Sequence, residues 1–283
     1  MNSTKLNVKT NKKLLMIHAD DAGLSHSQNK AIISCLKEGN VNSYSIMVPC
    51  KHFKEIADFA KKNPKYDYGI HLTLTCEWEK HRFGPVLPLS EVPSLVDENG
   101  HFFKKREQLH KHASSAEIEK EMKAQIDLAI QYGLQPSHID SHMYSVASSP
   151  AIFKVYKELE NKYHIPVLIS KNLYKNTGYD FINSIHETDL TLEQIHMGTF
   201  KDFESGKLWE FYENALQNLE EGINLILTHP AFDDDEMKSI TINHPNFGSK
   251  WRKIDYDFFT SNRCKALLKE NEIELVDWRD LKI

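Results

Sequence analysis

The stretch Leu14-Leu15-Met16-Ile17-His18-Ala19-Asp20-Asp21-Ala22-Gly23-Leu24-Ser25 decides how the rest of this chain is interpreted. It is typical of a short buried strand that runs into two adjacent carboxylates, a glycine turn and the polar start of a helix. Burying an unpaired charge is costly, and two neighbouring carboxylates repel each other. One of the pair therefore usually rests on a cation or holds a proton. When this stretch is taken alone, a loop with both acids solvated is an equal alternative.

Strands and helices alternate along the first quarter of the chain. The opening strand is followed by a predicted helix that ends near residue 38, a strand over 44–48, a helix over 53–63 and a strand over 68–74. Short links between such elements are typical of a parallel sheet. Successive strand residues point to opposite sides, so Asp20 and Asp21 can serve one site only if the strand bends. Ala22-Gly23 predicts that bend.

The alternation breaks after the third strand. Residues 76–114 contain three prolines and several aromatic and basic residues, but no clear hydrophobic period. So long a connection without regular structure is usually a functional loop or a disordered segment. Loops after strands build the active-site face of a β/α barrel. The segment 76–114, termed the excursion, is therefore predicted to be a lid or a substrate wall.

Regular alternation resumes after the excursion. Helices are predicted over 116–132, 149–163, 190–196, 208–219 and 257–271, and strands over 137–142, 167–170, 224–228 and 274–278. Seven or eight βα units in 283 residues suit one barrel domain. We predict a single α/β domain over 1–283, a distorted TIM-like (β/α) barrel with about seven parallel strands and a flexible tail over 1–11. A doubly wound open sheet is the alternative.

Composition and charge narrow the choice of partners and compartment. A formal net charge of −5 argues against nucleic acid as a partner. The sequence has no apolar run of membrane-spanning length, and its polar first residues lack the apolar core of a signal peptide. None of the four cysteines stands in a C-x-x-C pair, which fits free thiols in a reducing compartment. We expect a cytoplasmic protein without a membrane partner, and the base rate for soluble enzymes favours a homodimer.

Side chains that bind metals or transfer protons stand at the ends of four predicted strands. They are Asp20 and Asp21, His71, the trio His138, Asp140 and His142, and His229. In a barrel these ends converge on one face, where active sites of this architecture lie. A carboxylate with imidazoles is a ligand set for a divalent transition metal such as zinc, cobalt or manganese. Such an ion leaves room for a water molecule and lowers its pKa toward ~7.

Each of these residues alone has an ordinary explanation. A single histidine such as His71 in an apolar strand is more often a satisfied core residue than a ligand. His229, which precedes a proline, fits a loop role equally well. However, His138, Asp140 and His142 share one face of their predicted strand, which packing explains poorly. The joint occurrence at four strand ends favours a functional site over separate structural explanations.

Four motifs in order resemble those of the YdjC/ChbG family of carbohydrate deacetylases, which are related to chitooligosaccharide deacetylase. The motifs are Ala19-Asp20-Asp21-Ala22-Gly23-Leu24-Ser25, Gly69-Ile70-His71-Leu72-Thr73-Leu74-Thr75, His138-Ile139-Asp140-Ser141-His142 and Thr228-His229-Pro230-Ala231-Phe232. The resemblance runs nearly end to end, as far as Trp278-Arg279-Asp280. It is specific for the family and less specific for the substrate.

The resemblance implies a metal-dependent hydrolase on a distorted (β/α) barrel. Its substrate would be a small carbohydrate, an N-acetylglucosamine-type sugar or chitooligosaccharide, from which it removes the N-acetyl group as acetate. The resemblance also implies one divalent ion, either zinc, magnesium, cobalt or manganese. Asp21, His71 and His142 are its implied ligands.

The same resemblance implies roles for the remaining strand-end residues. Asp20 would be the general base that takes a proton from water, and His229 the acid that protonates the leaving amine. His138 and Asp140 would orient the ligands and fix their tautomers. Amide hydrolysis needs an activated water, a polarised carbonyl and a proton for the amine, which a metal and an acid–base pair supply.

The chain departs from the family pattern at two places. The family usually has Asn-Ala-Asp-Asp-Phe-Gly where this chain has His18 and Ala22, and it usually has further histidines where this chain has Met143 and Tyr144. The implied ligands survive both changes, whereas the lining of the pocket does not. The resemblance therefore leaves the length and decoration of the sugar open. Tyr144 and Arg252 are predicted to contact the substrate.

The acidic run Asp233-Asp234-Asp235-Glu236 directly follows the last motif. A solvated loop explains it better than a second cation site does. Three functions are weighed for the chain as a whole: the sugar N-deacetylase, another metal-dependent hydrolase of a modified or phosphorylated disaccharide, and a non-catalytic sugar-binding protein. A base beside a metal ligand argues against the third, because binding alone does not need one.

Overall fold

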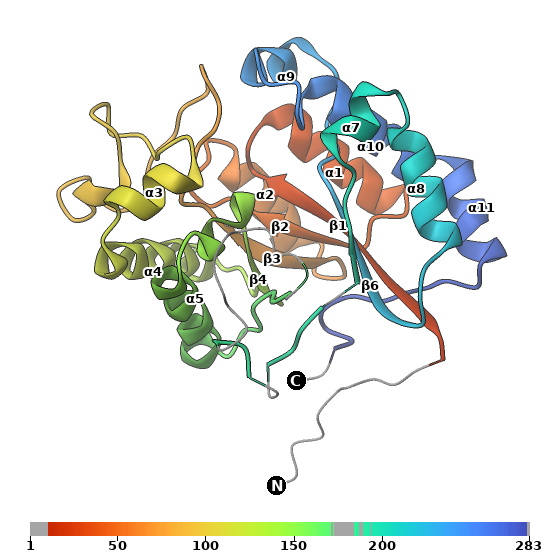
Figure 1. Ribbon diagram of the computed structural model, residues 1–283, viewed down its shortest axis with the longest axis horizontal. Helices are drawn as coiled ribbons and strands as arrows, with labels where there is room; N and C mark the ends of the chain where they lie inside the picture. The colour runs from red at the N-terminus through yellow and green to blue at the C-terminus, as the bar shows by residue number, and fades with distance from the viewer. Residues whose placement is uncertain (1–10, 171, 173–183, 187–188, 193, 282–283) are drawn as a thin grey trace, which may run out of the picture.

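A parallel sheet forms the centre of the protein. The computed structural model describes residues 11–170, 172, 184–186, 189–192 and 194–281 (Figure 1). The strands are β1 (Lys13–Ala22), β2 (Ser43–Ile46), β3 (Asp67–Leu72), β4 (Ile139–Ser141), β5 (Gln194–His196), β6 (Gly222–Thr228) and β7 (Glu274–Leu275). Every pairing between them is parallel. The predicted flexible tail, 1–11, lies outside the described residues except for its last residue.

The strand order is that of a barrel. The sheet runs β4-β3-β2-β1-β6-β5, with β7 also paired to β1. The first strand of the chain thus lies beside its last long strand, as it does where a β/α barrel closes. In a doubly wound sheet, a strand from the middle of the chain would lie beside β1 instead. The parallel half-barrel confirms the predicted fold class. Strands β2, β3 and β4 are buried throughout, as expected where helices cover a parallel sheet.

Helices cover the outside of the sheet (Figure 1). They are α1 (His26–Lys37), α2 (Phe53–Lys62), α4 (Ser115–Gln131), α5 (Pro150–Tyr163), α7 (Phe200–Glu204), α8 (Leu208–Gln217), α9 (Asp235–Ile240), α10 (Ser249–Phe259) and α11 (Asn262–Glu270). Side-chain caps decide where several of them begin. Ser25 accepts a hydrogen bond from the backbone N–H of Gln28 at the start of α1, and Ser149 accepts one from Ile152 at the start of α5.

Two predicted helices differ from the structure. The helix predicted over 190–196 is wrong, because Gln194–His196 form strand β5 and pair with β6. A run this short does not distinguish a helix from a strand by its period. The single helix predicted over 257–271 is two helices, since the side chain of Ser261 accepts a hydrogen bond from the backbone N–H of Cys264 and starts α11.

Two predicted strands are shorter than expected. The strand over 167–170 is reduced to the parallel bridges Ile139–Val167 and Ile169–Thr191, which extend the sheet beyond β4. The last strand, predicted over 274–278, ends after Leu275. The first lies beyond the β4 edge of the half-barrel, whereas the second pairs with only Leu14 and Leu15 of β1.

The excursion is ordered around its own apolar residues. It contains the short helix η1 (Pro93–Leu95), helix α3 (Arg106–His112) and an antiparallel bridge between Val96 and Phe102. Trp78 and Phe102 are fully buried. The guanidinium of Arg82 donates hydrogen bonds to the backbone oxygens of Cys76 and Phe102, which joins the two sides of the loop. Buried residues scattered along a compact loop give no hydrophobic period, so the sequence shows none.

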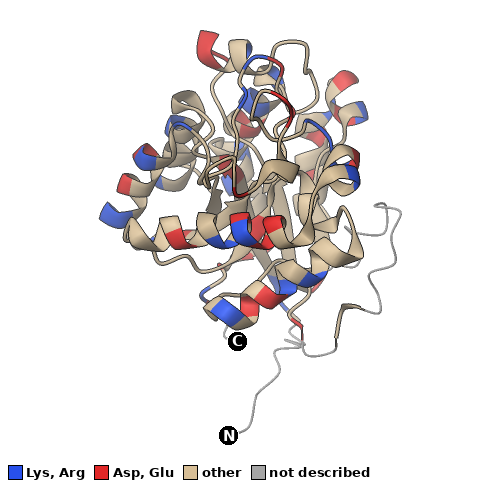
Figure 2. Ribbon diagram, turned by 90° about the vertical axis from the view of Figure 1, so that its left-hand side faces the viewer, with Lys and Arg blue, Asp and Glu red and all other residues tan. Residues whose placement is uncertain are grey.

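The surface charges and the cysteine thiols are arranged as the amino-acid composition leads us to expect. In Figure 2, residues of both charge signs are interspersed along the helices that face the viewer. Among the described residues, no helix has the length and apolar character that a membrane span requires. All four cysteines are free and buried, as the spacing predicts.

Candidate metal centre and active site

Strand β1 ends in a bulge that brings two successive acids to one cavity. The register between β1 and β2 shifts between Ala19 and Ala22. Asp21 has a φ of 65°, in the left-handed region, which Asp enters more readily than most other non-glycine residues. The bend predicted at Ala22-Gly23 therefore begins one residue earlier. Because of it, Asp20 and Asp21 both line the same cavity although strand residues normally alternate.

Asp21 is the buried centre of the site. Its Oδ1 lies 3.3 Å from His71 Nε2 and 3.0 Å from His142 Nδ1. Its Oδ2 accepts a hydrogen bond of 2.8 Å from Arg252. Burial favours the neutral acid, but the charges of His142 and Arg252 prevail and hold the pKa of Asp21 well below its usual range. One ligand atom each of Asp21, His71 and His142 lies within 4.8 Å of the others, so the three predicted ligands are brought together.

Asp140 on β4 decides which nitrogen of His71 is available. Its Oδ1 lies 2.8 Å from His71 Nδ1. Burial opposes ionisation of Asp140, but the charge of His71 outweighs it and lowers the pKa of the carboxyl well below its usual range. An ionised carboxylate only accepts hydrogen bonds, so His71 carries a proton on Nδ1, and Nε2, which faces Asp21, is the nitrogen that a metal could take. Asp140 thus contacts the outer nitrogen of His71, as its predicted role in orienting that histidine requires.

Glu77 of the excursion stands behind His142 in the same way. Its Oε2 lies 2.9 Å from His142 Nε2, which leaves Nδ1 of that ring toward Asp21. Burial raises the pKa of Glu77, but the charge of His142 outweighs it and the net shift is downward. Sequence reasoning missed Glu77, because it is one acid within a segment that shows no period.

The donor set fits a divalent transition metal. Two imidazole nitrogens and one carboxylate oxygen are ligands that zinc, cobalt and manganese accept. When no cation is bound, burial works against charge on His142, but attraction to Glu77 and Asp21 prevails and raises its pKa to about 9. Burial is likewise outweighed at His71, where Asp140 and Asp20 raise the pKa well above its usual value. The acids around the two histidines are therefore stabilised by positive charge, which protons or a bound cation can supply.

His18 lies between Asp20 and Asp140, a position that the sequence reasoning did not assign to it. Its Nε2 is 3.1 Å from Asp140 Oδ2 and 3.2 Å from Asp20 Oδ1, and its Nδ1 is 2.9 Å from Ser43 Oγ. Ser43 gives its own proton to Asp67, so its oxygen accepts from His18, and both ring nitrogens carry protons. Burial opposes this charge, but hydrogen bonds with Asp140 and Asp20 raise the pKa of His18 to about 9. The sequence held one signal of this role: His18 stands where the family usually has asparagine.

His138 is buried one layer away from the ligands. Its ring stacks on Trp278 with 4.6 Å between centroids, and its Nδ1 lies 2.9 Å from Ser137 Oγ. It approaches the acids through His18, whose ring centroid is 5.0 Å away. The strand predicted over 137–142 spans only Ile139–Ser141, so the shared face expected for the three polar residues is not that of one strand. The orienting role of His138 stays a prediction.

His229 follows β6 and approaches Asp20. Its Nε2 lies 3.6 Å from Asp20 Oδ2. Its backbone N–H donates a hydrogen bond of 2.9 Å to Asp255, which also accepts one of 2.7 Å from the Tyr212 hydroxyl. Burial lowers the pKa of His229 to about 4, so its ring is neutral near pH 7. Asp255 was missed, because a single acid in an amphipathic helix gives no sign of its partner.

A cavity of about 250 Å³ is lined by Asp20, Asp21, His71, Glu77, His142 and His229. Tyr144 and Arg252 also line it, although the guanidinium of Arg252 is engaged by Asp21 and Gln28. The wall is completed by residues that sequence reasoning did not single out: Arg106, Met143, Met197, His244, Asn246 and Phe247. The substrate contacts predicted for Tyr144 and Arg252 stay predictions.

The acidic run after the last motif serves the ends of helices. Asp234 caps α9 by accepting a hydrogen bond from Met237 N–H. Glu236 accepts hydrogen bonds from the backbone N–H groups of His26 and Ser27, the first residues of α1. Carboxylates are stabilised at such positive helix ends.

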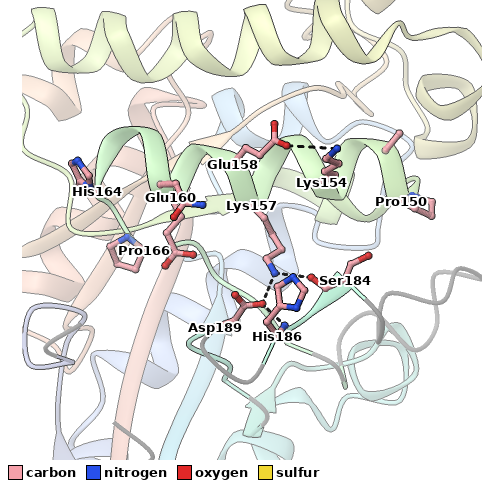
Figure 3. A pocket seen from close by; sticks show the side chains of 12 residues that line it. Pro150, Lys154, Lys157, Glu158, Glu160, His164, Pro166, Ser184, His186 and Asp189 are labelled. Carbon is pink, nitrogen blue, oxygen red and sulfur yellow. Dashed lines mark hydrogen bonds and ion pairs between the residues drawn. The ribbon is translucent and has the colours of Figure 1, made fainter. Parts of the chain in front are cut away.

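A second, larger cavity lies beside α5 and has a different character (Figure 3). Its volume is about 1110 Å³, and its charged side chains are largely paired with each other. Lys157 binds Asp189 and the backbone oxygen of Ser184, and Lys154 lies 3.9 Å from Glu158. Among its described lining residues there is no set of carboxylate and imidazole donors like the one around Asp21. The smaller cavity is therefore the candidate active site.

Comparison with known proteins places the chain among carbohydrate deacetylases in sequence. It is 29% identical over 270 residues to the carbohydrate deacetylase of Thermoanaerobacter pseudethanolicus, with 95% of this chain and 100% of that protein covered. It is 36% identical over 152 residues to the carbohydrate deacetylase of Geobacillus stearothermophilus, with 54% of this chain and 58% of that protein covered.

A solved structure and a family model agree with these relatives. The crystal structure of a protein from Enterococcus faecalis V583, named for a proposed role in cellobiose-phosphate cleavage, superimposes with a TM-score of 0.78 at 26% identity. That superposition covers 96% of this chain and 100% of the other. The model of the YdjC-like protein family matches residues 14–270, nearly the whole chain. This chain therefore belongs to the YdjC-like family, as its four motifs predict.

Proposed function

We propose that this protein is a metal-dependent hydrolase that removes the acetyl group from an N-acetylated sugar. The observation that carries the proposal is the meeting of Asp21, His71 and His142 in one cavity, beside the two acid–base candidates Asp20 and His229. The names of the sequence relatives, carbohydrate deacetylases, support the same reaction class.

Asp21, His71 and His142 would hold the ion. A divalent metal at this place supplies Lewis acidity, which polarises the amide carbonyl and makes water more acidic. Asp140 and Glu77 keep the two histidines oriented with one lone pair each toward Asp21. Nitrogen donors favour zinc, cobalt or manganese over magnesium.

Asp20 and His229 would transfer a proton from the attacking water to the leaving nitrogen. Asp20 would take it from the attacking water, and the imidazolium of His18, 3.2 Å from Asp20 Oδ1, would hold this carboxylate in place. His229 Nε2, 3.6 Å from Asp20 Oδ2, receives the proton and passes it to the leaving nitrogen. Because burial lowers the pKa of His229 to about 4, its protonated form is a strong donor. The products are acetate and a free amino sugar.

The test is an acetate-release assay on the purified protein with a panel of sugars. The panel holds N-acetylglucosamine, short chitooligosaccharides and their phosphorylated forms, each assayed after removal of metal and after addition of zinc, cobalt, manganese or magnesium. We expect acetate release that requires an added metal. Absence of release from every member of the panel, with metal bound, would refute the deacetylase assignment.

The name of the Enterococcus protein favours one alternative, hydrolysis of a phosphorylated disaccharide. The same panel separates the two reactions, because glycosidic cleavage yields monosaccharides whereas deacetylation leaves the oligosaccharide length unchanged. Binding without either product would instead identify a non-catalytic sugar-binding protein.

A further inference from the structure

A second group of metal-binding side chains lies outside the active-site cavity. His26 is the first residue of α1, His52 precedes α2, and Glu55 lies in the first turn of α2. Glu236 of α9 approaches them, since α1 packs against both α2 and α9 (Figure 1). These four residues, termed the rim cluster, include none of the residues that line the cavity around Asp21.

The donor atoms of the rim cluster are spaced as metal ligands are. His26 Nδ1 lies 2.7 Å from Glu55 Oε1, and His52 Nδ1 lies 3.4 Å from Glu55 Oε2. One ligand atom from each of these residues lies within 4.8 Å of the others. Donors about 2.0–2.2 Å from a tetrahedral zinc ion are roughly 3.3–3.6 Å apart, so the three can surround an ion after small shifts.

Neighbouring groups already orient the donors. Asn29, which is buried, donates a hydrogen bond of 3.2 Å to Glu55 Oε2. The other nitrogen of His52, Nε2, faces Glu236 Oε1 at 3.6 Å. Glu236 is itself held by the first backbone N–H groups of α1, at 3.2 and 2.7 Å. A carboxylate behind the outer nitrogen of an imidazole is the usual support of a histidine ligand.

We propose that His26, His52 and Glu55 form a second site for a divalent transition metal such as zinc, with Glu236 as the carboxylate that orients His52. Two imidazoles and one carboxylate leave a position for water, and the side chains are 23–48% exposed, so a cation reaches them from solvent. The ion would tie the starts of α1 and α2 together. Because β1 leads directly into α1, it would brace the turn that carries Asp21. This site does not depend on the proposed deacetylase activity.

The test first compares zinc binding by four forms of the whole protein, to which two further variants are then added. They are the wild type, the rim variant H26Q/H52Q, the variant H71Q/H142Q that removes the active-site donors, and H101Q. His101 is a matched control, because its Nδ1 lies 3.8 Å from Asp97, an imidazole–carboxylate pair without a third donor. Zinc is counted by elemental analysis after gel filtration and by calorimetric titration of the metal-stripped protein.

We expect wild type and H101Q to bind a second equivalent of zinc that H26Q/H52Q lacks. H71Q/H142Q should keep that equivalent, and cobalt bound to it should show the absorption bands of tetrahedral coordination. E236Q should weaken the rim site by about 10- to 100-fold. The proposal is overturned if H26Q/H52Q binds as much zinc as wild type, or if zinc binding by H71Q/H142Q survives the added rim substitutions. Circular dichroism verifies that each variant is folded, and neither outcome depends on whether acetate is released.

Discussion

Two carboxylates support the two histidines of the candidate metal centre from different parts of the fold. Asp140 belongs to strand β4 and accepts hydrogen bonds from His71 and Ser45 while also facing His18. Glu77 belongs to the excursion, and its hydrogen bond is to His142. The strand residue is thus the hub of a buried network, whereas the loop residue does one task. We infer that the barrel holds the chemistry rigidly and that the excursion completes it.

The largest effects should come from Asp20 and Asp21, the two acids at the end of β1 that line the same cavity as the supported histidines. Asp20→Asn should lower kcat by a factor of about 10² to 10⁴ because it removes the proton acceptor, while the metal stays bound. Asp21→Asn should instead lose the metal, because an amide oxygen is a weaker ligand than a carboxylate. Acetate release and metal content are measured on both variants. The opposite pattern would mean that the roles of the two acids are exchanged.

The comparison itself is tested by a matched pair of amide substitutions. Asp140→Asn should weaken zinc binding toward the upper end of an about 10- to 100-fold range, and Glu77→Gln toward the lower end. An amide offers one acceptor oxygen, which satisfies the single hydrogen bond of His142 to Glu77 but not the three donors, His71, Ser45 and His18, that Asp140 serves. Zinc affinity is measured by competition with a coloured chelator.

Glu121→Gln is the control for that pair. Glu121 is buried and holds the excursion through the backbone N–H groups of Val86 and Leu87, at 2.8 and 3.1 Å. Within the described residues its carboxylate contacts none of Asp21, His71 and His142, so its substitution should leave zinc affinity within about threefold of wild type. Equal losses for Asp140→Asn and Glu77→Gln would refute the distinction between hub and single support.

Metal binding should weaken as the pH falls. The pKa of His142 is raised to about 9 when no cation is bound, so this ring is protonated at neutral pH. A ligand nitrogen must be neutral, so zinc displaces at least one proton, and its apparent affinity should fall by about tenfold per pH unit from pH 9 downward. Glu77→Gln removes one of the charges that raise this pKa and should flatten the profile. Calorimetry in two buffers of different ionisation enthalpy counts the protons released, and a flat affinity between pH 6 and 9 would contradict the prediction.

The smallest effect is expected at the wall of the cavity. Tyr144→Asn removes the aromatic ring but keeps a residue that tolerates the φ of 51° at this position. Loss of packing worth about 0.5–1.5 kcal/mol should raise KM about two- to tenfold with kcat nearly unchanged. Steady-state kinetics on the best substrate of the panel measure both constants. A fall in kcat with constant KM would place Tyr144 in the chemistry instead.

The barrel and the meeting of the strand-end residues were predictable because they rest on local patterns, whereas the choice of ligands among them came from the resemblance to the family. Buried parallel strands leave apolar runs in the sequence, and the barrel brings the ends of these runs to one face. Asp21, His71 and His142 each stand at the end of such a run or just beyond it, so their convergence follows from the fold class.

The supporting residues were not predictable, since their roles arise from contacts between distant segments. Glu77 and His142 are 65 positions apart in the sequence. The backbone of His229 is 26 positions away from Asp255. Neither pair has a periodic signature. His18 could be noticed only as a departure from the family pattern, and its two protons follow from the direction of the Ser43 hydrogen bond. The helix predicted over 190–196 failed because seven residues carry too little pattern.

The left-handed backbone of Asp21 also limits which sequences can occupy this position. Most side chains are disfavoured at a φ of 65°, and glycine, asparagine and aspartate are among those that tolerate it. In a library of all substitutions at residue 21, variants with asparagine or glycine should accumulate as folded protein more readily than those with valine or isoleucine. Only aspartate among the tolerated residues carries a charged oxygen ligand. Backbone geometry and the proposed ligand role therefore favour the same residue independently.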